Sequence, residues 1–385
     1  MTLEKFDWLH AFLPNPDPEL AHHLTRSFIT AHVLNALNQG LKHPKYATPQ
    51  LSKYFRQARS LGSKDRRRTA NICYDIIRYE GFLRSCGATD PREWIELYHC
   101  LIKGDSIRGQ TKNPTSDFAA ALSIPENIAR EWLMKHTRTD AVKLGQVLML
   151  QPSTYLRVNL RSSSRQYVQE ALFKENISTE LVSESDSALK LTGRANLIAS
   201  SAYRNGLFEI QDLSCQRFCQ DLELFLGGLK GLKIFDMCAG AGGKSLALAT
   251  RGAKLFAADP RTHALRELIK RSHRAHADIT IKKPKKADVV LLDVPCSGTG
   301  RLAREPTLRW KYRHSPPPQH CATQKLLLAE ASKIADQYIV YATCSLLDEE
   351  NTPVLQGWVK QHSVWYWPHQ KDGDGFYWAI FKKEI

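Results

Sequence analysis

Two cysteines and one aspartate stand where their side chains can act together. Asp293 and Cys296 follow an apolar run at residues 289–292, and Cys344 follows a second apolar run that begins at Tyr338. A cysteine thiolate is a strong nucleophile when neighbouring charges or a helix end lower its pKa. A single buried cysteine is more often core filler. Two cysteines at strand ends beside an aspartate instead favour nucleophilic catalysis.

The two apolar runs are typical of buried strands in a parallel sheet. Residues 289–292 are valine and leucine, and the Asp293 carboxylate ends the run. A proline and two glycines then force a turn. Ligands of open α/β sheets bind at the carboxyl ends of the strands. We therefore expect Asp293, Cys296 and Cys344 to face one crevice.

A glycine-rich turn between an expected strand and an expected helix predicts a nucleoside cofactor. It consists of Cys238, Ala239, Gly240, Ala241, Gly242, Gly243 and Lys244. Glycines let backbone amides approach a ligand closely, and Asp259, at the end of the next strand, is placed to bind ribose hydroxyls. The turn matches neither the dinucleotide pattern Gly-x-Gly-x-x-Gly nor the P-loop pattern. S-adenosylmethionine therefore fits better than a dinucleotide.

Methylation of a pyrimidine at carbon 5 requires this set of groups. Carbon 5 is a weak nucleophile, but a thiolate added at carbon 6 makes it enamine-like and able to accept a methyl group. A base must then remove the proton from carbon 5 before the thiol departs. A carboxylate such as Asp293 can stabilise the adduct near N3 and the exocyclic amine. The residues alone do not decide whether Cys296 or Cys344 is the nucleophile.

The length of the chain and the changes in its sequence pattern predict three parts. A chain of 385 residues exceeds the usual size of one core. Residues 1–150 have helical spacing, with a basic turn at Lys64 and Arg66–Arg68. Residues 151–205 have the pattern of a small α/β unit, and residues 206–385 alternate strands and helices. This alternation predicts a mostly parallel, doubly wound α/β sheet.

Within these parts, the patterns place particular elements. We expect single helices over residues 125–150 and 348–361 and a closing strand over residues 376–381. The first 20 residues contain three prolines and predict a loose arm. Pro316–Pro318 predict a loop over the active site.

The composition restricts the partner and the compartment. A net charge of +15 favours a polyanionic partner, most simply a nucleic acid. Nine cysteines without any Cys-x-x-Cys argue for reduced thiols, and no spacing suits a common metal site. No run of 18 apolar residues occurs, and the first residues lack a signal-peptide pattern. We therefore expect a cytoplasmic protein with no membrane contact, no metal and no obligate protein partner.

Several segments resemble the RsmB/Sun-type family of RNA 5-cytosine methyltransferases. IFDMCAGAGGKS resembles the cofactor loop of the family, VVLLDVPCSGTGRLAREPTLRW its Pro-Cys motif, and YATCSLLDEEN its Thr-Cys motif. NGLFEIQDLSCQ and GDGFYWAIFKK match flanking signatures. LGSKDRRRTANICYDIIRY resembles a NusB-like helical domain, and YLRVNLRSSS resembles the entry to a small RRM-like unit. The resemblance covers nearly the whole chain.

The resemblance implies a domain order and an activity. Residues 1–150 would be a NusB-like RNA-binding domain, residues 151–205 an RRM-like unit, and residues 206–385 a Rossmann-like class I methyltransferase domain. The implied reaction is the formation of 5-methylcytosine in RNA, most simply ribosomal RNA, with S-adenosylmethionine as the methyl donor. RNA is then the implied partner.

The resemblance also implies a role for each site residue. Cys344 is the implied nucleophile, and Cys296 is needed for product release. In DNA 5-cytosine methyltransferases the cysteine of the Pro-Cys motif is the nucleophile instead. Asp293 is expected near both cytosine and cofactor, Asp259 on the cofactor ribose, and residues 238–244 around the methionine moiety.

The sequence departs from the family pattern at three places. Ala241 stands where the cofactor loop usually has proline, so we expect a less rigid loop. Thr307 stands where the Pro-Cys motif usually has aspartate. The acid that normally follows the third strand and contacts adenine is missing, because lysines follow Ile281, and Asp278 or a backbone group would have to replace it. The missing acid keeps a catalytically impaired RNA-binding or ribosome-assembly homologue as an alternative. A tRNA or DNA methyltransferase is a further alternative, and the NusB-like domain disfavours DNA.

Overall fold

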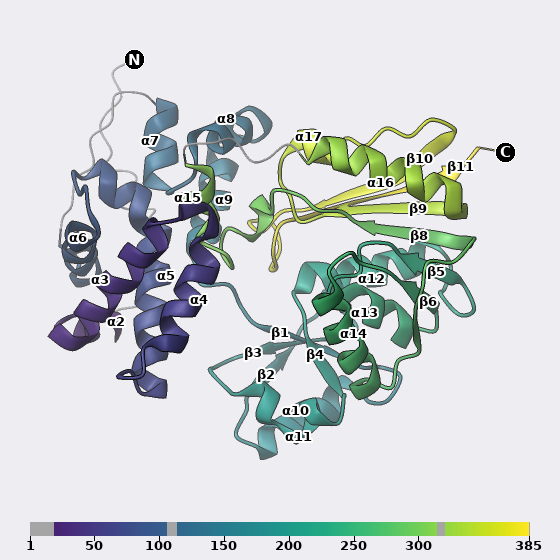
Figure 1. Ribbon diagram of the computed structural model, residues 1–385, viewed down its shortest axis with the longest axis horizontal. Coiled ribbons are helices and arrows are strands. Elements are labelled where there is room, and N and C mark those ends of the chain that lie inside the picture. The colour runs from purple at the N-terminus through teal and green to yellow at the C-terminus, as the bar shows by residue number, and fades with distance from the viewer. Residues whose placement is uncertain (1–18, 106–113, 314–319, 385) are drawn as a thin grey trace. The chain divides into compact units, whose positions relative to one another are not determined.

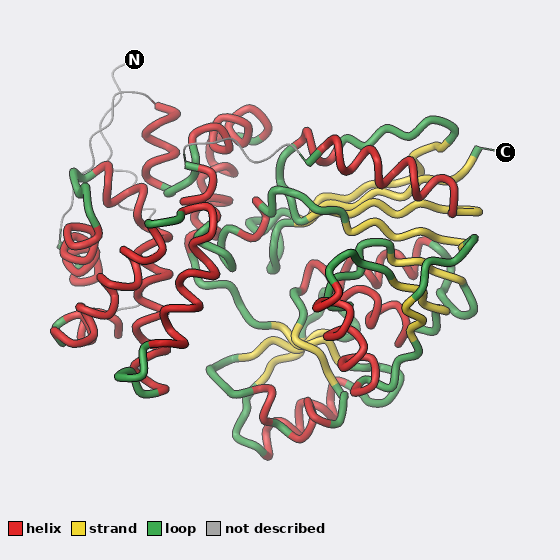
Figure 2. Tube along the Cα trace, in the orientation of Figure 1, coloured by secondary structure: helices red, strands yellow, loops and turns green. Residues whose placement is uncertain are grey.

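The computed structural model describes residues 19–105, 114–313 and 320–384 (Figure 1). The chain forms two compact units. Residues 1–152 and 301–318 make up the first unit, and residues 153–300 and 319–385 make up the second. All described strands lie in the second unit (Figure 2). Most of the expected loose arm and all of Pro316–Pro318 lie outside the described residues.

The first unit is helical. Its longer elements are α2 (Glu19–Leu24), α3 (Ser27–Leu41), α4 (Ala47–Gln57), α5 (Ser63–Ser85), α6 (Pro91–Lys103), α7 (Pro114–Ala121), α8 (Glu126–Lys135) and α9 (Arg138–Met149). The expectation of one helix over residues 125–150 is wrong. The Thr137 hydroxyl accepts a hydrogen bond from the Asp140 N–H, so it caps a new helix, α9, after α8 has ended. The assignment of this unit as NusB-like stays a prediction.

A segment from the middle of the catalytic sequence packs among these helices. It contains α15 (Leu308–Tyr312), which begins within the last residues of the Pro-Cys motif. The Trp310 ring is buried and lies 6.3 Å from the Trp94 ring, centroid to centroid. The buried Arg309 guanidinium donates a hydrogen bond of 2.8 Å to the Leu148 carbonyl. The residues at the end of the Pro-Cys motif are therefore part of the core of the helical unit.

Thr307, which stands in place of the expected aspartate, lies in this same segment. It is buried, and its hydroxyl shares a hydrogen bond with the Thr48 hydroxyl at the start of α4. A nearby carbonyl, that of Ala303, accepts a hydrogen bond of 2.9 Å from Arg78 on α5. Thr307 thus has a packing role inside the helical unit.

The second unit begins with a small antiparallel sheet. Its strands are β1 (Tyr155–Val158), β2 (Thr179–Leu181), β3 (Ala188–Leu191) and β4 (Phe208–Ile210), in the spatial order β2-β3-β1-β4. Helix α10 (Arg165–Lys174) follows β1, and α11 (Ser201–Arg204) precedes β4. This β-α-β-β-α-β order is the split βαβ arrangement expected of an RRM-like unit. The small sheet extends to Ile210, past residue 205.

A seven-stranded sheet forms the rest of the second unit, in the order β10-β11-β9-β8-β5-β6-β7. The strands are β5 (Lys233–Asp236), β6 (Lys254–Ala257), β7 (Ile279–Ile281), β8 (Ala287–Asp293), β9 (Ala335–Thr343), β10 (Trp358–Tyr366) and β11 (Phe376–Lys383). Strands β5 to β9 are parallel, and β10 and β11 pair antiparallel. The expected doubly wound α/β sheet is confirmed. The chain moves outward in opposite directions from β5 and β8, so the switch point lies between these two strands.

Helices cover both faces of this sheet (Figure 1). They are α12 (Leu213–Phe225), α13 (Gly243–Thr250) and α14 (Thr262–Arg274) on one face, and α16 (Cys321–Ile334) on the other. Successive residues of β8 serve the two cores in turn. Val289 and Leu291 pack with residues of α12 and α13, whereas Val290 and Leu292 pack with residues of α16. This explains why β8 is apolar throughout: it is buried on both sides.

The expectation of a helix over residues 348–361 is wrong. Only α17 (Asp348–Asn351) is helical, and residues from Trp358 onward form the edge strand β10. Pro353 cannot donate the backbone hydrogen bond that a continuing helix needs, and Gly357 takes the left-handed conformation, with φ of 75°. Pairing with β11 then outweighs local helical preference. The expected closing strand at 376–381 is confirmed as part of β11.

Candidate active site

The glycine-rich loop and Asp293 meet at the switch point of the sheet. The loop follows β5, and Asp293 is the last residue of the adjacent strand β8. Lys244, in the first turn of α13, donates a hydrogen bond of 2.6 Å from its Nζ to Asp293 Oδ2. The Lys244 side chain is 11% exposed and that of Asp293 33%. This largely buried ion pair joins the two strand ends.

The backbone of the loop depends on two glycines. Gly240 and Gly242 have φ angles of 54° and 83°, which other residues rarely adopt. A Cβ on Gly242 would also lie 2.4 Å from Leu268 Cδ1 of α14. Although Ala241 replaces the usual proline, its carbonyl accepts a hydrogen bond of 2.7 Å from Arg271 of α14. A side chain from α14 therefore restrains the loop where the proline is missing.

The two cysteines lie next to each other. Cys296 Sγ is 3.4 Å from Cys344 Sγ, within the reach of a thiol hydrogen bond. The backbone N–H of Gly300 donates to the Cys344 carbonyl at 2.9 Å, so the two loops are also linked through their main chains. A Cβ on Gly300 would lie 2.2 Å from the Gly375 carbonyl oxygen, so this position accepts only glycine. The structure thus brings the two thiols to one point of the sheet edge.

The electrostatic surroundings distinguish the groups at this point. The hydrogen bond with Cys344 and then burial raise the pKa of the Cys296 thiol well above its ordinary value. Burial disfavours the charged form of Lys244, but the adjacent Asp293 carboxylate outweighs it, and the pKa of Lys244 lies above its ordinary value. The Cys344 sulfur raises the pKa of Lys244 as well, so it lies within electrostatic reach of the ammonium. A permanent cation in reach of a thiol favours the thiolate.

A buried polar network, which the sequence analysis missed, holds the two cysteine loops together. The Glu350 side chain is 1% exposed and accepts hydrogen bonds from the backbone N–H and hydroxyl of Ser297, at 2.8 and 2.6 Å. The Ser297 hydroxyl lies 3.0 Å from the Ser345 hydroxyl, next to Cys344. Asn351 continues the network by donating to the Ser345 carbonyl at 2.9 Å. No local sequence pattern indicates this network, because Ser297 and Glu350 are 53 positions apart.

Asp236, at the end of β5, is a second group without a predicted role. Its carboxylate is buried, and it accepts hydrogen bonds from the Ser245 hydroxyl and, more weakly, from the Cys238 N–H, at 2.6 and 3.3 Å. Burial raises the pKa of Asp236 to about 7. Burial likewise raises the pKa of the Cys238 thiol, to about 12. These two groups therefore shape the loop without adding a negative charge at acidic pH.

Asp259 lies at the loop but is engaged by protein groups. It accepts a hydrogen bond of 2.8 Å from the Gly240 N–H, and Arg261 Nε and Nη2 each donate to it at 2.8 Å. The hydrogen bonds from Arg261 lower the pKa of Asp259 to about 2. The Arg261 side chain is 60% exposed, so it is anchored at one end only.

The end of β7 carries lysines, as expected. Lys282 and Lys283 follow Ile281 and are exposed, and Lys283 forms an ion pair with Glu330 of α16. Asp278 cannot replace the missing acid, because it precedes β7 and lies at the opposite edge of the sheet. There it lines a cavity with residues such as Lys254, which begins β6.

The site offers some of the groups that an adenosyl cofactor needs. The loop after β5 presents backbone amides, and the Asp259 carboxylate lies hydrogen-bonded to that loop. These residues fit the amino-acid and ribose portions of S-adenosylmethionine. Among the described residues, no cluster of three or more His, Cys, Asp or Glu side chains is arranged to hold a metal ion. No described helix has both the length and the apolar composition of a membrane span.

Comparison with known proteins identifies relatives. Residues 225–365 match a family described as 16S rRNA methyltransferase RsmB/F. Ribosomal RNA small subunit methyltransferase B of Proteus mirabilis is 30% identical over 282 residues, which cover 66% of this chain and 65% of that protein. This chain thus spans just under two thirds of the relative.

Two solved structures share the fold. One, titled Crystal Structure of PH0851, has a TM-score of 0.71 and 18% identity, over 96% of this chain and 100% of that one. A methyltransferase homolog protein from Pyrococcus horikoshii has a TM-score of 0.57 and 20% identity, over 71% and 100%. At such identities these likenesses show the fold alone. Residues 225–365 of this chain are thus similar to the RsmB/F methyltransferases, and the similarity to the Proteus relative extends over 282 residues.

Proposed function

We propose that this chain is an S-adenosylmethionine-dependent methyltransferase that forms 5-methylcytosine in RNA. The observation that carries the proposal is the 3.4 Å separation of the Cys296 and Cys344 sulfurs beside the Lys244–Asp293 ion pair. Addition of a thiol to cytosine needs a nucleophile, a stabilising polar group and a second group to complete the release. All three stand at one end of the sheet.

Cys344 is the nucleophile in this proposal. Its thiolate adds to carbon 6 of cytosine and leaves carbon 5 with the electron density of an enamine. The cation of Lys244, within electrostatic reach of Cys344, favours the thiolate. The choice of Cys344 over Cys296 follows the family resemblance, in which the cysteine of the Thr-Cys motif is the nucleophile. Asp293, at the end of β8, would stabilise the adduct at N3 and the exocyclic amine.

Release of the product completes the reaction. A base removes the proton from carbon 5, the electron pair of that bond re-forms the double bond between carbons 5 and 6, and the bond from carbon 6 to Cys344 breaks. The Cys296 thiol, 3.4 Å from the departing sulfur, would assist this elimination. The Ser297–Glu350–Ser345 network keeps the two thiols at this separation throughout.

The cofactor would lie against the loop after β5. Residues 238–244 would surround its methionine portion, and Asp259 would bind the ribose. When bound, S-adenosylmethionine supplies an electrophilic methyl group. The chain itself orients the cytosine, holds the thiols and excludes water from the adduct.

Two cysteine variants test the mechanism. We expect Cys344→Ala to abolish methyl transfer from radiolabelled S-adenosylmethionine and to form no adduct. We expect Cys296→Ala to accumulate a covalent protein–RNA complex, seen as a shifted band on a denaturing gel. Cys100→Ala is the control, since Cys100 is a free cysteine of the helical unit outside the two motifs. Adduct formation by Cys344→Ala would reverse the assignment of the two cysteines.

The substrate is most simply ribosomal RNA. The Proteus mirabilis relative is named a ribosomal RNA small subunit methyltransferase. Bisulfite sequencing of total RNA from a deletion strain, compared with its parent, would identify the target nucleotide. Loss of a cytosine mark in tRNA alone would instead support a tRNA methyltransferase.

A second function is favoured by the cofactor side of the site. Asp259 is paired with Arg261, and lysines replace the acid after β7. These features suit a homologue that binds RNA during ribosome assembly without methylating it. Isothermal titration calorimetry separates the two functions: heat of binding with S-adenosylmethionine supports the enzyme, and its absence supports the assembly factor.

A further inference from the structure

The hairpin of helices α4 and α5 carries an unusual excess of positive charge. Residues 42–68 contain nine lysines and arginines and one acidic residue, Asp65. Their net charge of +8 is more than half of the +15 of the whole chain. Asp65 accepts hydrogen bonds from Arg26 and Arg68, at 3.2 and 3.5 Å, and is thus neutralised locally. The remaining basic side chains of residues 42–68 have no other acidic residue in that stretch to pair with.

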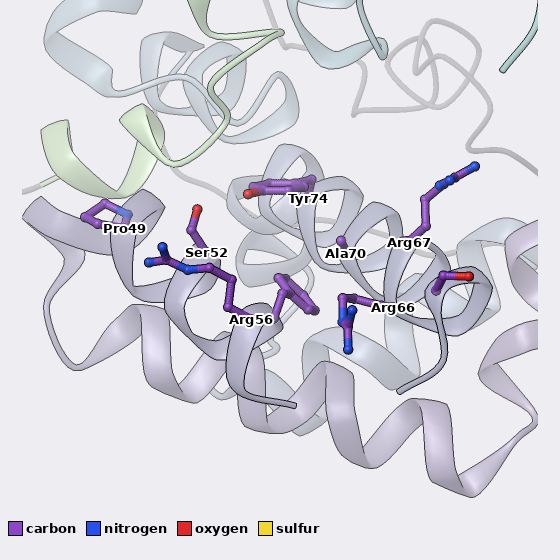
Figure 3. Close-up of a pocket in the computed structure, with 9 residues that line it drawn as sticks. Pro49, Ser52, Arg56, Arg66, Arg67, Ala70 and Tyr74 are labelled. Atoms are coloured by element: carbon purple, nitrogen blue, oxygen red, sulfur yellow. The ribbon is translucent and has the colours of Figure 1, made fainter. Parts of the chain in front are cut away.

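A cavity of about 740 Å³ lies between these two helices. The side chains that matter most for its chemistry are Ser52, Arg56, Ser63, Arg66, Arg67 and Tyr74, and no acidic residue lines it. Figure 3 shows Arg56 and Arg67 on opposite sides of the Tyr74 ring, with the end of the Arg67 side chain directed away from the ring. A volume of this size is typical of pockets that hold small organic molecules or parts of larger ones.

The three arginines differ in how they are held. Arg66 Nη2 donates to the carbonyls of Ala58 and Leu61, at 3.2 and 2.9 Å, so its guanidinium is fixed against the hairpin turn. Its Nε is buried and has no hydrogen-bond partner among the described residues. Arg56 and Arg67 line the pocket and form no ion pair within the described part of the chain. Two free guanidinium groups therefore flank one fixed group and an aromatic ring.

We propose that this pocket binds a single-stranded segment of RNA. Arg56 and Arg67 would contact backbone phosphates, since guanidinium groups pair with phosphate oxygens in bidentate fashion. The half-buried Tyr74 would contact an unstacked base, as aromatic side chains do in proteins that bind single strands.

Single-stranded RNA fits the observations better than other polyanions. A duplex presents its phosphates on a convex surface and keeps its bases stacked, so it would not enter a concave pocket lined by Tyr74. An acidic peptide could satisfy the arginines but would leave the aromatic lining unused. The inference goes beyond the proposed methyl transfer and takes from it only the choice of RNA as the probe.

The test measures RNA binding by the full chain without cofactor. A fluorescently labelled, short single-stranded RNA is titrated by anisotropy over a range of KCl concentrations. The pocket variant is Arg56→Ala with Arg67→Ala, and the matched control is Arg92→Ala with Lys143→Ala. Arg92 and Lys143 are exposed residues of the same helical unit, on α6 and α9, and the control changes the net charge equally.

We expect the pocket variant to bind RNA about tenfold more weakly, and the slope of log affinity against log salt to fall by about 1.4 for two lost phosphate contacts. The control should change affinity by less than about twofold, because distant charges are screened. Tyr74→Leu should weaken binding about fivefold with no change in the salt slope. Thermal unfolding of each variant verifies that the helical unit is intact.

Three results would overturn the inference. The first is equal loss of affinity in the pocket and control variants, which would indicate general charge attraction. The second is an unchanged salt slope, and the third is competition by polyglutamate that matches competition by single-stranded RNA. Because Cys296 and Cys344 take no part in this measurement, a failure of methyl transfer would leave its outcome untouched.

Discussion

The ends of β8 and β9 and the ends of β6 and β7 lie along one edge of the same sheet, yet they hold their polar side chains in different ways. At β8 and β9 the two thiols are 3.4 Å apart, and the buried Glu350 network links their loops. At β6 and β7 the Asp259 carboxylate is paired with an exposed arginine, and lysines follow the strand. The first pair of strand ends is interlinked by buried groups. At the second pair the Asp259 side chain is buried, but its partner Arg261 and the lysines after β7 are exposed.

This difference indicates where the site tolerates change. A group held by buried hydrogen bonds cannot be altered without leaving a donor or acceptor unpaired, which costs about 1–3 kcal/mol. The exposed Lys283–Glu330 pair after β7 differs, because a surface ion pair contributes only about 0–1 kcal/mol and its partners can be exchanged. We infer that the cysteine side of the edge is tightly specified and that the cofactor side has room to vary.

The largest effect should come from Lys244→Met, which removes the link between the two sides. Asp293 loses its cation, and Cys344 loses the positive charge within its electrostatic reach. We expect the single-turnover rate of methyl transfer to fall about 10²–10³-fold, the range for loss of one preorganised electrostatic group. Lys254→Met, at the start of β6, is the control. A Lys244→Met rate equal to that of the control would exclude Lys244 from the chemistry.

The second prediction concerns the stability of the protein. It involves a residue at the end of β5, the strand between β8 and β6. The raised pKa of Asp236, about 7, means that the folded protein keeps a proton which the unfolded chain loses near pH 4. The contribution of Asp236 to the free energy of unfolding therefore falls as pH rises from about 4 to about 7 and stays constant above that range. Asp236→Asn should remove this slope and stabilise the protein at pH 8 by up to about 3 kcal/mol.

Urea unfolding at pH 5 and pH 8 checks this expectation. The side-chain amide introduced by Asp236→Asn would still accept the hydrogen bond from Ser245, so the loop should keep its position. Equal pH slopes for the two proteins would show that Asp236 is ionised in the folded state. In that case the end of β5 would carry a charged carboxylate and not a neutral carboxyl group.

Local sequence predicted the strand ends well because a buried strand and the turn after it are encoded by neighbouring residues. The apolar run before Asp293 and the glycines after Cys238 each needed only local residues to be recognised. The residues that hold the site together needed contacts between distant segments. Glu350 meets Ser297 across 53 positions, and no local pattern indicates that pairing.

The same reason explains the errors. Acidic residues from Asp348 onward favour a helix start, but the edge of β11 recruited Trp358 and its neighbours into a strand. The segment around Trp310 ends the Pro-Cys motif in the sequence, whereas its packing partner Trp94 lies in α6. The position of this segment is determined by the burial of its side chains against helices that are distant in the sequence, and not by its neighbours in the chain.

A moderate effect is expected for the ribose contact. Asp259→Asn should weaken binding of S-adenosylmethionine about tenfold, because a neutral amide accepts weaker hydrogen bonds than a carboxylate. With a pKa of about 2, Asp259 stays ionised above about pH 4, and its stabilising contribution is lost only as pH falls toward 2. Affinity measured by calorimetry should therefore not titrate with this group between about pH 5 and 8. An unchanged affinity for Asp259→Asn would remove Asp259 from the cofactor site.

The smallest effect should come from restoring an acid at the end of β7. Lys282→Asp places a carboxylate directly after Ile281, at the strand end where the family pattern has its adenine contact. Lys282 is exposed and forms no ion pair within the described residues, so the change should not disturb the fold. We expect binding of S-adenosylmethionine to tighten about three- to tenfold, the value of one added hydrogen bond. Lys285→Asp, further along the same loop, is the control, since Lys285 is also exposed. Equal affinities for both variants would mean that the open side of the sheet edge recognises the adenine through its backbone, and that the lost acid was never needed in this chain.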